Sequence, residues 1–350
     1  MKKTILLLLS ILFLLYSCKK LEPTVPQGDI KKVCLNKATI PDSALASAIR
    51  GALGINSGAD ICDDFLAYID TLQINSQVNN FTGIEKLHNL QHLIIYNNTL
   101  SDLSFLSLVP TVNNLEIYYG ALASTNGISA LTGLRQLTIY NSPTGAFTGI
   151  STLVNLTYLK LGDCGVRDTD MNMLAAMTKL TFLWLSDNNI SSVSTVSGLT
   201  GLTQFRADNC HFTSLYPLSG LTKLTFISCN GNQLASLNGI SGLTNLDTLS
   251  AQYNVINDIS AITGATALKN LELSHNAITA ITELSGLTNL TNIDLGYNSI
   301  TSIYPLYRNM QSGGFGPGDS AIFIYNPLNQ TPDIDTYIPA LIAAGAAITY

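Results

Sequence analysis

The sequence has few charged side chains and a single tryptophan. Charged residues make up 11% of its 350 positions, and 17 basic residues stand against 23 acidic ones, which gives a formal net charge of −6. A nucleic-acid-binding protein neutralises phosphates with clusters of Lys and Arg, so this composition argues against that class. Hydrophobic residues make up 46% of the chain and the mean hydropathy is +0.27. So much apolar surface excludes a disordered polypeptide.

The sequence also lacks the usual signatures of metal and nucleophile chemistry. Only two of its four histidines, His88 and His92, are close together, and no H-E-x-x-H motif contains them. The glycine-rich stretch 313–318 lacks the Lys-Ser/Thr ending of a phosphate-binding loop and predicts a flexible loop. No serine lies in a G-x-S-x-G motif. We therefore expect no metal, no cofactor and no catalytic residue, and a chain that is not an enzyme.

The longest apolar run is the N-terminal stretch 5–16, which follows two lysines. About twelve residues are too few to cross a hydrocarbon core of ~30 Å as a helix, but they suit the apolar part of a signal peptide. The run ends in Leu-Tyr-Ser-Cys18, which resembles the lipobox of bacterial lipoproteins. The resemblance implies that residues 1–17 are removed and that the sulfur of Cys18 carries a lipid. An ordinary signal peptide with an incidental cysteine is the alternative.

The residues that follow Cys18 bear on where the chain is held. Lys19 stands where an Asp, in enteric bacteria, favours retention in the inner membrane. The resemblance therefore implies a lipid anchor in the outer membrane of the bacterial cell envelope, and it leaves open whether the protein faces the periplasm or the cell surface. Residues 18–30 contain two prolines and a glycine and predict a short tether. No other apolar run approaches spanning length, so membrane contact is expected through the anchor only.

A period of 22 residues organises the rest of the chain. The pattern L-x-x-L-x-L-x-x-N-x-L recurs at intervals of 22 residues, apart from one interval of 24. Its first positions are Leu90, Val112, Leu134, Leu156, Leu180, Leu202, Leu224, Leu246, Leu268 and Leu290. Ile69, Leu72 and Ile74 form a weaker copy that starts 21 residues before Leu90. A single unit of this kind cannot bury its own apolar edges, so neighbouring units must stack into a solenoid.

The pattern resembles bacterial leucine-rich repeats of the internalin type over residues 69–310. The resemblance implies an α/β fold, a right-handed solenoid with a parallel β-sheet on the concave face and 3₁₀ or short helices on the convex side. The residues agree with it: Leu271 and Leu273 alternate as in a strand, and Ile278 and Ile281 follow at the spacing of three that suits 3₁₀ turns. The asparagine is expected to turn the chain by bonding to free backbone groups. Its column reads Asn98, Gly120, Ser142, Cys164, Asn188, Cys210, Asn232, Asn254, Asn276 and Asn298.

Both open ends of a solenoid need a cap. Residues 31–68 are expected to form a helical N-terminal cap, with Asp42 or Ser43 at the start of the helix. Residues 311–350 are expected to form a C-terminal cap composed of a strand, a helix and a final strand. In this cap, we interpret Ile322 and Ile324 as a continuation of the apolar alternation.

Five cysteines besides Cys18 fall into two groups. Cys34 and Cys62 both belong to the predicted N-terminal cap of a protein outside the cytoplasm, so they are candidates for a disulfide. Two free buried thiols are the alternative. The other three are expected to be small buried side chains of the repeats: Cys164, Cys210 and Cys229.

The outward-facing strand positions define the candidate ligand surface. Tyr96, Tyr118 and Tyr140 share one column over three successive coils and predict a ladder with a spacing of about 5 Å. Exposed aromatic residues with arginine are typical of binding hot spots. The candidate ligand-binding residues are Tyr96, Tyr118, Tyr119, Tyr140, Tyr158, Lys160, Phe182, Trp184, Arg206 and Phe226. The C-terminal coils present small polar residues instead, so binding is expected to centre on residues 90–226. Aromatic pairs that only stabilise the sheet are the alternative.

These observations predict a lipid-anchored, non-enzymatic binding protein. The leucine-rich-repeat resemblance implies a protein or peptide ligand on the concave face, although a fold alone does not fix a function. A glycan-binding surface lipoprotein is the alternative, because a pyranose offers a flat C–H face to an aromatic ring. An enzyme with an active site dispersed over the solenoid is a third hypothesis.

Overall fold

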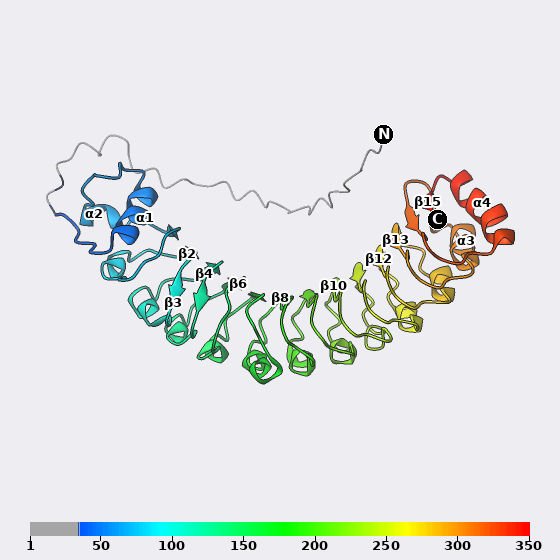
Figure 1. Cartoon of the computed structure of the whole chain (residues 1–350), viewed down its shortest axis with the longest axis horizontal. Coiled ribbons are helices and arrows are strands. Elements are labelled where there is room, and N and C mark those ends of the chain that lie inside the picture. Colours follow the sequence, from blue (N-terminus) through cyan, green and yellow to red (C-terminus); the bar gives the residue numbers. More distant parts are fainter. Residues whose placement is uncertain (1–33, 35) are drawn as a thin grey trace.

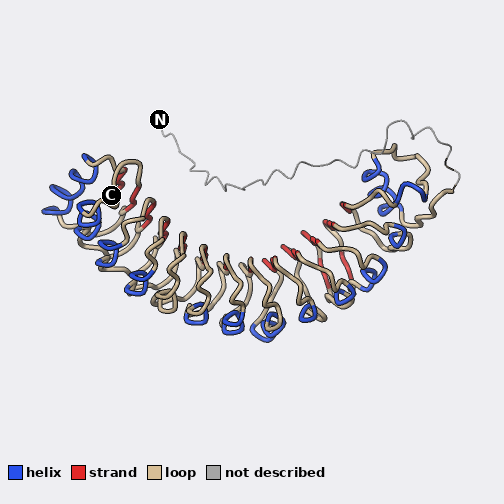
Figure 2. Tube along the Cα trace, turned by 180° about the vertical axis from the view of Figure 1, so that it is seen from behind, coloured by secondary structure: helices blue, strands red, loops and turns tan. Residues whose placement is uncertain are grey.

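The computed structural model describes Cys34 and residues 36–350, so Cys18, the signal peptide 1–17 and the tether 18–30 lie outside the described residues. The described chain is a curved ribbon of stacked coils, with strands along the inside of the curve and short helices along the outside (Figure 1). The view from behind shows the same separation of strands and helices (Figure 2). None of the described helices is both long and apolar enough to cross a membrane.

The concave face is a single parallel sheet of thirteen strands that follow one another in chain order. Its strands are β1 (Thr71–Ile74), β2 (His92–Tyr96), β4 (Asn114–Tyr118), β6 (Gln136–Tyr140), β7 (Tyr158–Gly162), β8 (Phe182–Trp184), β9 (Gln204–Arg206), β10 (Phe226–Ser228), β11 (Thr248–Ser250), β12 (Asn270–Glu272), β13 (Asn292–Asp294), β14 (Ser320–Ile322) and β15 (Ala347–Thr349). On one flank β3 (Thr99–Leu100) pairs with β5 (Ala121–Leu122). The predicted solenoid with a parallel concave sheet is confirmed.

The core runs the whole length of the ribbon. Leu161, Leu185 and Ala207 occupy the same position on three successive coils and are fully buried. Burying one leucine side chain contributes about 1.5–3 kcal/mol, and stacking repeats this contribution in every coil. The convex side carries the 3₁₀ helices η1 (Ile84–Lys86), η2 (Ser104–Leu108), η3 (Ile128–Ala130), η4 (Ile150–Thr152), η5 (Asp168–Leu174), η6 (Ser194–Gly198), η7 (Tyr216–Leu218), η8 (Ser260–Gly264) and η9 (Thr282–Gly286).

The asparagine column is buried and links each coil to its neighbours. The Asn254 amide donates to the carbonyls of Cys229, Ala251 and Gln252, each at 3.1 Å. Its Oδ1 accepts from the Leu234 amide at 3.0 Å. One side chain therefore satisfies four backbone groups that the turn leaves without partners. The same pattern of bonds recurs at Asn188, Asn276 and Asn298. The Asn98 amide donates to two carbonyls, those of Ser76 and Tyr96, and its Oδ1 accepts from the Val78 amide.

Other residues take over part of this role where the asparagine is missing. The Cys164 thiol donates to the carbonyls of Ile139 at 2.9 Å and Gly162 at 3.2 Å. The Ser142 hydroxyl donates to the Tyr140 carbonyl and accepts from the Gly120 amide. These substitutes make fewer bonds, so the N-terminal coils turn with weaker side-chain support than the C-terminal ones.

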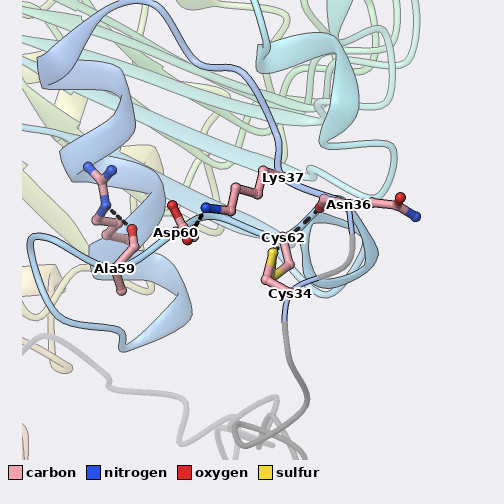
Figure 3. Close-up of a disulfide and its surroundings, with 7 residues drawn as sticks. Cys34, Asn36, Lys37, Ala59, Asp60 and Cys62 are labelled. Carbon is pink, nitrogen blue, oxygen red and sulfur yellow. Dashed lines mark hydrogen bonds and ion pairs between the residues drawn. A yellow bond between two sulfur atoms is a disulfide. The ribbon is translucent and has the colours of Figure 1, made fainter.

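The N-terminal end is covered by α1 (Ser43–Leu53) and α2 (Asp63–Leu66). The Asp42 carboxylate accepts hydrogen bonds from the Ala44 and Leu45 amides at the start of α1. Cys34 and Cys62 form a disulfide with Cα atoms 5.6 Å apart, and the ion pair of Lys37 with Asp60 lies beside it (Figure 3). The disulfide fastens the first described residue to the cap.

The C-terminal end is covered by three helical segments and the last strand. They are α3 (Tyr304–Gln311), the π-helical η10 (Gln330–Tyr337), α4 (Ile338–Ala343) and β15. Helix α3 begins inside the predicted repeat region, so the last coil already contributes to the closing unit. The predicted register of β14 is wrong by one residue: Ala321 and Phe323 are buried, whereas Ile322 and Ile324 are only half-buried.

Candidate ligand-binding surface

Nine of the ten predicted site residues lie on the concave face, in three columns along strands β2 to β10. Tyr96, Tyr118 and Tyr140 are in register on adjacent strands. Tyr158 and Phe182 share a second column, and Lys160, Trp184 and Arg206 share a third. Phe226 of β10 is in register with Gln204 of β9, so it belongs to the column of Tyr158 and Phe182. These nine side chains are half-buried, as expected for outward residues that pack against one another.

Tyr119 differs from the other nine because it follows β4 and lies outside the sheet. Its backbone has φ 55°, in the left-handed region, and its side chain is 54% exposed. Its ring lies 6.1 Å from that of Tyr118 and meets the Tyr140 ring edge-on at 6.4 Å. Tyr119 therefore extends the aromatic surface beyond the edge of the strands.

The three-tyrosine ladder has one regular step only. The rings of Tyr96 and Tyr118 stack at 5.1 Å with an interplanar angle of 14°. The Tyr140 ring turns away and lies 6.1 Å from Trp184. Gly162, next in the same column, makes this possible because a Cβ there would lie 2.9 Å from Cδ2 of Tyr140. The prediction of three evenly spaced rings is therefore wrong at its third member.

Trp184 is the centre of the patch and is flanked by two cations. The Lys160 ammonium lies 3.8 Å from the Trp184 ring centroid and 4.0 Å from that of Tyr140. The Arg206 guanidinium lies 4.8 Å from Trp184 and 5.0 Å from Phe226. Burial lowers the pKa of Lys160, and the positive charge of Arg206 lowers it further. Within residues 36–350 neither cation has an acidic side chain at ion-pair distance.

Unsatisfied hydrogen-bonding capacity accompanies these charges. The Trp184 indole N–H is buried and has no acceptor among the described residues. A buried donor without a partner is costly, so the described residues leave one hydrogen bond unmade at the centre of the patch. Beside it the rings of Tyr158 and Phe182 stack at 4.2 Å with an angle of 5°. The patch therefore combines positive charge, an indole donor and aromatic surface.

A polar cluster next to the patch was not predicted. Nε2 of His92 lies 2.7 Å from Oε1 of Glu116, and the Tyr118 hydroxyl donates to Oε2 at 2.6 Å. The hydrogen bonds from His92 and then Tyr118 hold the pKa of Glu116 below its ordinary value. Burial, followed by the Glu116 carboxylate, raises the pKa of Tyr118. The cluster fixes the Tyr118 ring against Tyr96.

This cluster predicts a pH-dependent contribution to stability. The pKa of Glu116 is lower in the folded chain than the ordinary value of 4.5. The Glu116 carboxylate therefore adds to the free energy of unfolding at pH values above 4.5. This contribution is lost as the pH falls through the lower folded pKa. We expect the difference in unfolding free energy between wild type and Glu116→Gln to shrink between neutral pH and about pH 3 in urea titrations. A difference that does not change with pH would contradict this assignment.

The C-terminal coils also carry an aromatic surface that the sequence analysis missed. One position beyond the outward columns, Tyr253, His275, Tyr297 and Tyr325 stack with successive centroid distances of 4.2, 4.0 and 4.4 Å. The expectation of only small polar residues in these coils is therefore wrong. The signal was in the sequence, because three of the four residues recur at intervals of 22.

Other parts of the surface offer less chemistry. A hollow of about 860 Å³ lies on the flank beside β3 and β5, where Phe81 and Phe105 stack at 3.7 Å. Its lining mixes apolar side chains with polar ones, Asp102 and Arg167 among them, and contains none of the predicted site residues. No cluster of three metal-ligating side chains occurs in the part of the chain that the structure describes.

Comparison with known proteins identifies the class. A family model described as "Leucine Rich repeats (2 copies)" matches residues 266–308. No curated protein sequence matches the chain. Solved structures are similar over most of its length. The internalin InlF of Listeria monocytogenes has a TM-score of 0.74 at 23% identity, covering 88% of this chain and 95% of its own.

Two further solved structures extend the comparison. A leucine-rich-repeat protein of Leptospira interrogans has a TM-score of 0.59 at 19% identity, covering 81% of this chain and 90% of its own. The ectodomain of the Arabidopsis thaliana receptor kinase GASSHO1/SCHENGEN3, solved with CASPARIAN STRIP INTEGRITY FACTOR 2, has a TM-score of 0.63 at 17% identity, covering 82% of this chain and 36% of its own. The chain therefore has the leucine-rich-repeat solenoid fold. Its bacterial structural neighbours are internalin-like.

Proposed function

We propose that this chain is a lipid-anchored, non-enzymatic recognition protein that binds a protein or peptide ligand on its concave face. The observation that carries the proposal is the Trp184 patch, where an indole is flanked by two cations that have no acidic partner within residues 36–350. Leucine-rich-repeat proteins generally mediate protein–protein binding, and the plant ectodomain above was solved with a protein factor. The patch contains residues of the kinds enriched at binding hot spots.

The charges of the patch favour a ligand with acidic side chains. Lys160 and Arg206 are partly desolvated and lie 3.8 and 4.8 Å from the same ring. A carboxylate that approaches from the concave side would pair with either cation, since no acidic side chain of the described residues lies at ion-pair distance from them. Charge-assisted hydrogen bonds of this kind are about twice as strong as neutral ones.

A glycan ligand is the second candidate, and Tyr119 is the observation that favours it. This residue is 54% exposed; its ring meets Tyr140 edge-on and is tilted by 30° from Tyr118 at 6.1 Å, so part of the ring is open to a ligand. Trp184, by contrast, has cations near its ring and offers a sugar less free surface. Protein capture and a glycan array, run side by side with the mature protein, distinguish the two ligand classes. If the mature protein binds neither proteins nor glycans, the concave face is rejected as a recognition surface.

The lipid anchor is proposed on the Leu-Tyr-Ser-Cys18 sequence alone. Replacing Cys18 by Ala removes the only sulfur to which the lipid can be attached at this motif. We expect the wild type to incorporate labelled fatty acid and to sediment with outer membranes, whereas Cys18→Ala is unlabelled. An unlabelled wild type would show that the segment is an ordinary signal peptide.

A further inference from the structure

One column of residues runs along the edge of the concave face, and all of its described members have left-handed backbone. We call it the rim. Its residues are Asn97, Tyr119, Asn141, Asp163, Asp187, Asn209, Gly231, Tyr253, His275, Tyr297 and Tyr325, with φ between 47° and 64°. Asn and Gly adopt this conformation most readily, and bulky aromatic residues rarely do. Tyrosines retained at such positions point to a function beyond forming the turn.

The chemistry of the rim changes at Gly231. Before this residue the rim is polar and acidic apart from Tyr119, and after it the rim is the aromatic stack from Tyr253 to Tyr325. Within the stack the rings cover one another, with Tyr253 and His275 only 12° from parallel. The face of Tyr253 that points away from His275 looks towards Gly231, which has no side chain to cover it. Tyr253 is accordingly 59% exposed.

The opposite wall of this gap is Asn209. Its amide donates to Oδ1 of Asp187 at 2.8 Å, which directs its own Oδ1 over Gly231. A Cβ on Gly231 would lie 2.4 Å from that oxygen. Asn209 Oδ1 accepts no hydrogen bond from any described residue. Asn209 and Tyr253 are separated by two interstrand spacings, roughly 10 Å, whereas a planar group in contact on both sides needs about 7 Å.

The rim is acidic on the side of the gap that precedes Asn209. Asp163 and Asp187 are exposed on the same rim, and neither has a cation at ion-pair distance within the described chain. The described rim contains no Lys or Arg. An acceptor oxygen, an open aromatic face and two unpaired carboxylates in a row suit a planar cation with several N–H donors, which is the arginine guanidinium.

We propose that the Gly231 gap binds an arginine of an extended basic segment in a partner protein. The guanidinium stacks on Tyr253 and donates to Oδ1 of Asn209, and neighbouring basic side chains pair with Asp187 and Asp163. This site is distinct from the Trp184 patch, because its residues lie on the rim beyond the strands, whereas Lys160, Trp184 and Arg206 lie on the strands. The two surfaces therefore recognise segments of opposite charge.

Synthetic peptides test the proposal on the mature protein. The probe is a fluorescent amide-capped peptide of four Gly-Arg repeats, compared with the same peptide carrying Lys or the uncharged citrulline in place of Arg. Anisotropy titrations should give binding about fivefold to tenfold tighter for Arg than for Lys, because only Arg stacks as a planar cation. Citrulline should bind more weakly than either. Equal affinity for the Arg and Lys peptides overturns the proposal.

Two variants locate the binding to the gap. Gly231→Asn fills it with a residue that adopts the same backbone at Asn97 and Asn141, and Tyr253→Asn removes the stacking face. Each should cancel the preference for Arg, whereas Tyr325→Asn, the same change at the far end of the stack, should keep it. A preference that survives in both gap variants overturns the assignment. The capture of protein ligands by Tyr253→Asn is measured in parallel. This variant leaves the Trp184 patch unchanged, so its capture tests the concave-face proposal independently of the rim.

Discussion

Replacing Trp184 and Tyr118 together by alanine is expected to abolish ligand capture on the concave face. Trp184 holds the two cations: the Lys160 ammonium is 3.8 Å and the Arg206 guanidinium 4.8 Å from its ring. Without the indole both cations lose their fixed positions. Tyr118 supports the adjoining aromatic surface through Tyr96 and Glu116. Truncating hot-spot residues costs about 2 kcal/mol or more each, so affinity should fall at least about a thousandfold.

The fold should survive this double substitution. Both residues lie on the outward face, and the core positions beside Trp184 are Leu183 and Leu185, which are fully buried. Tyr216→Ala is the matched control, because it removes an aromatic ring that is 72% exposed on the convex side. It should capture ligand as the wild type does in pull-down and calorimetric assays. If the double variant retains capture, the binding site lies on the caps or the convex side.

Asn254→Ala is expected to be the most destabilising single change among those proposed. It removes four hydrogen bonds and leaves the carbonyls of Cys229, Ala251 and Gln252 with fewer partners in a buried turn. Unsatisfied buried groups cost about 1–3 kcal/mol each, so a loss of roughly 3–5 kcal/mol is expected after partial relaxation. Denaturant unfolding followed by circular dichroism measures it.

An exposed asparagine in the same region supplies the control. Asn245 donates a single hydrogen bond, 2.9 Å long, to the Thr222 carbonyl at the surface. Asn245→Ala should change stability by no more than about 0.5 kcal/mol. Because each coil contacts only its neighbours, the damage in Asn254→Ala should stay local in hydrogen exchange. Equal losses in both variants would show that the buried column does not hold the turns.

The periodic features of this fold were predictable from the sequence. Leu161, Leu185 and Ala207 could be assigned to adjacent coils because inward positions tolerate only apolar residues and the interval is fixed. The register of the concave columns follows from the same interval, so nine of the ten site residues could be placed on one face. The end of the chain was harder to predict: at β14 a longer insertion breaks the interval, and Phe323 takes the core position given to Ile324.

Features that depend on side-chain orientation could not be predicted. The Tyr140 ring turns towards Trp184 because Gly162 leaves room. The residue types in a column do not reveal how a side chain is oriented. The contact of His92 with Glu116 joins two columns diagonally, so reading one column at a time did not reveal it. The stack from Tyr253 to Tyr325 depends on a left-handed backbone that the repeat imposes on residues that rarely adopt it.

Three thiols in the asparagine column and the core have a practical consequence. Cys164, Cys210 and Cys229 are free and buried in three different coils. Burial raises the pKa of Cys164 to about 12 and that of Cys210 to about 11, so both remain protonated and unreactive at neutral pH. An alkylating reagent can modify them only when the surrounding coil opens. The protein thus contains its own labelling probes for local unfolding, and peptide mapping of the modified cysteine identifies where along the ribbon the opening begins.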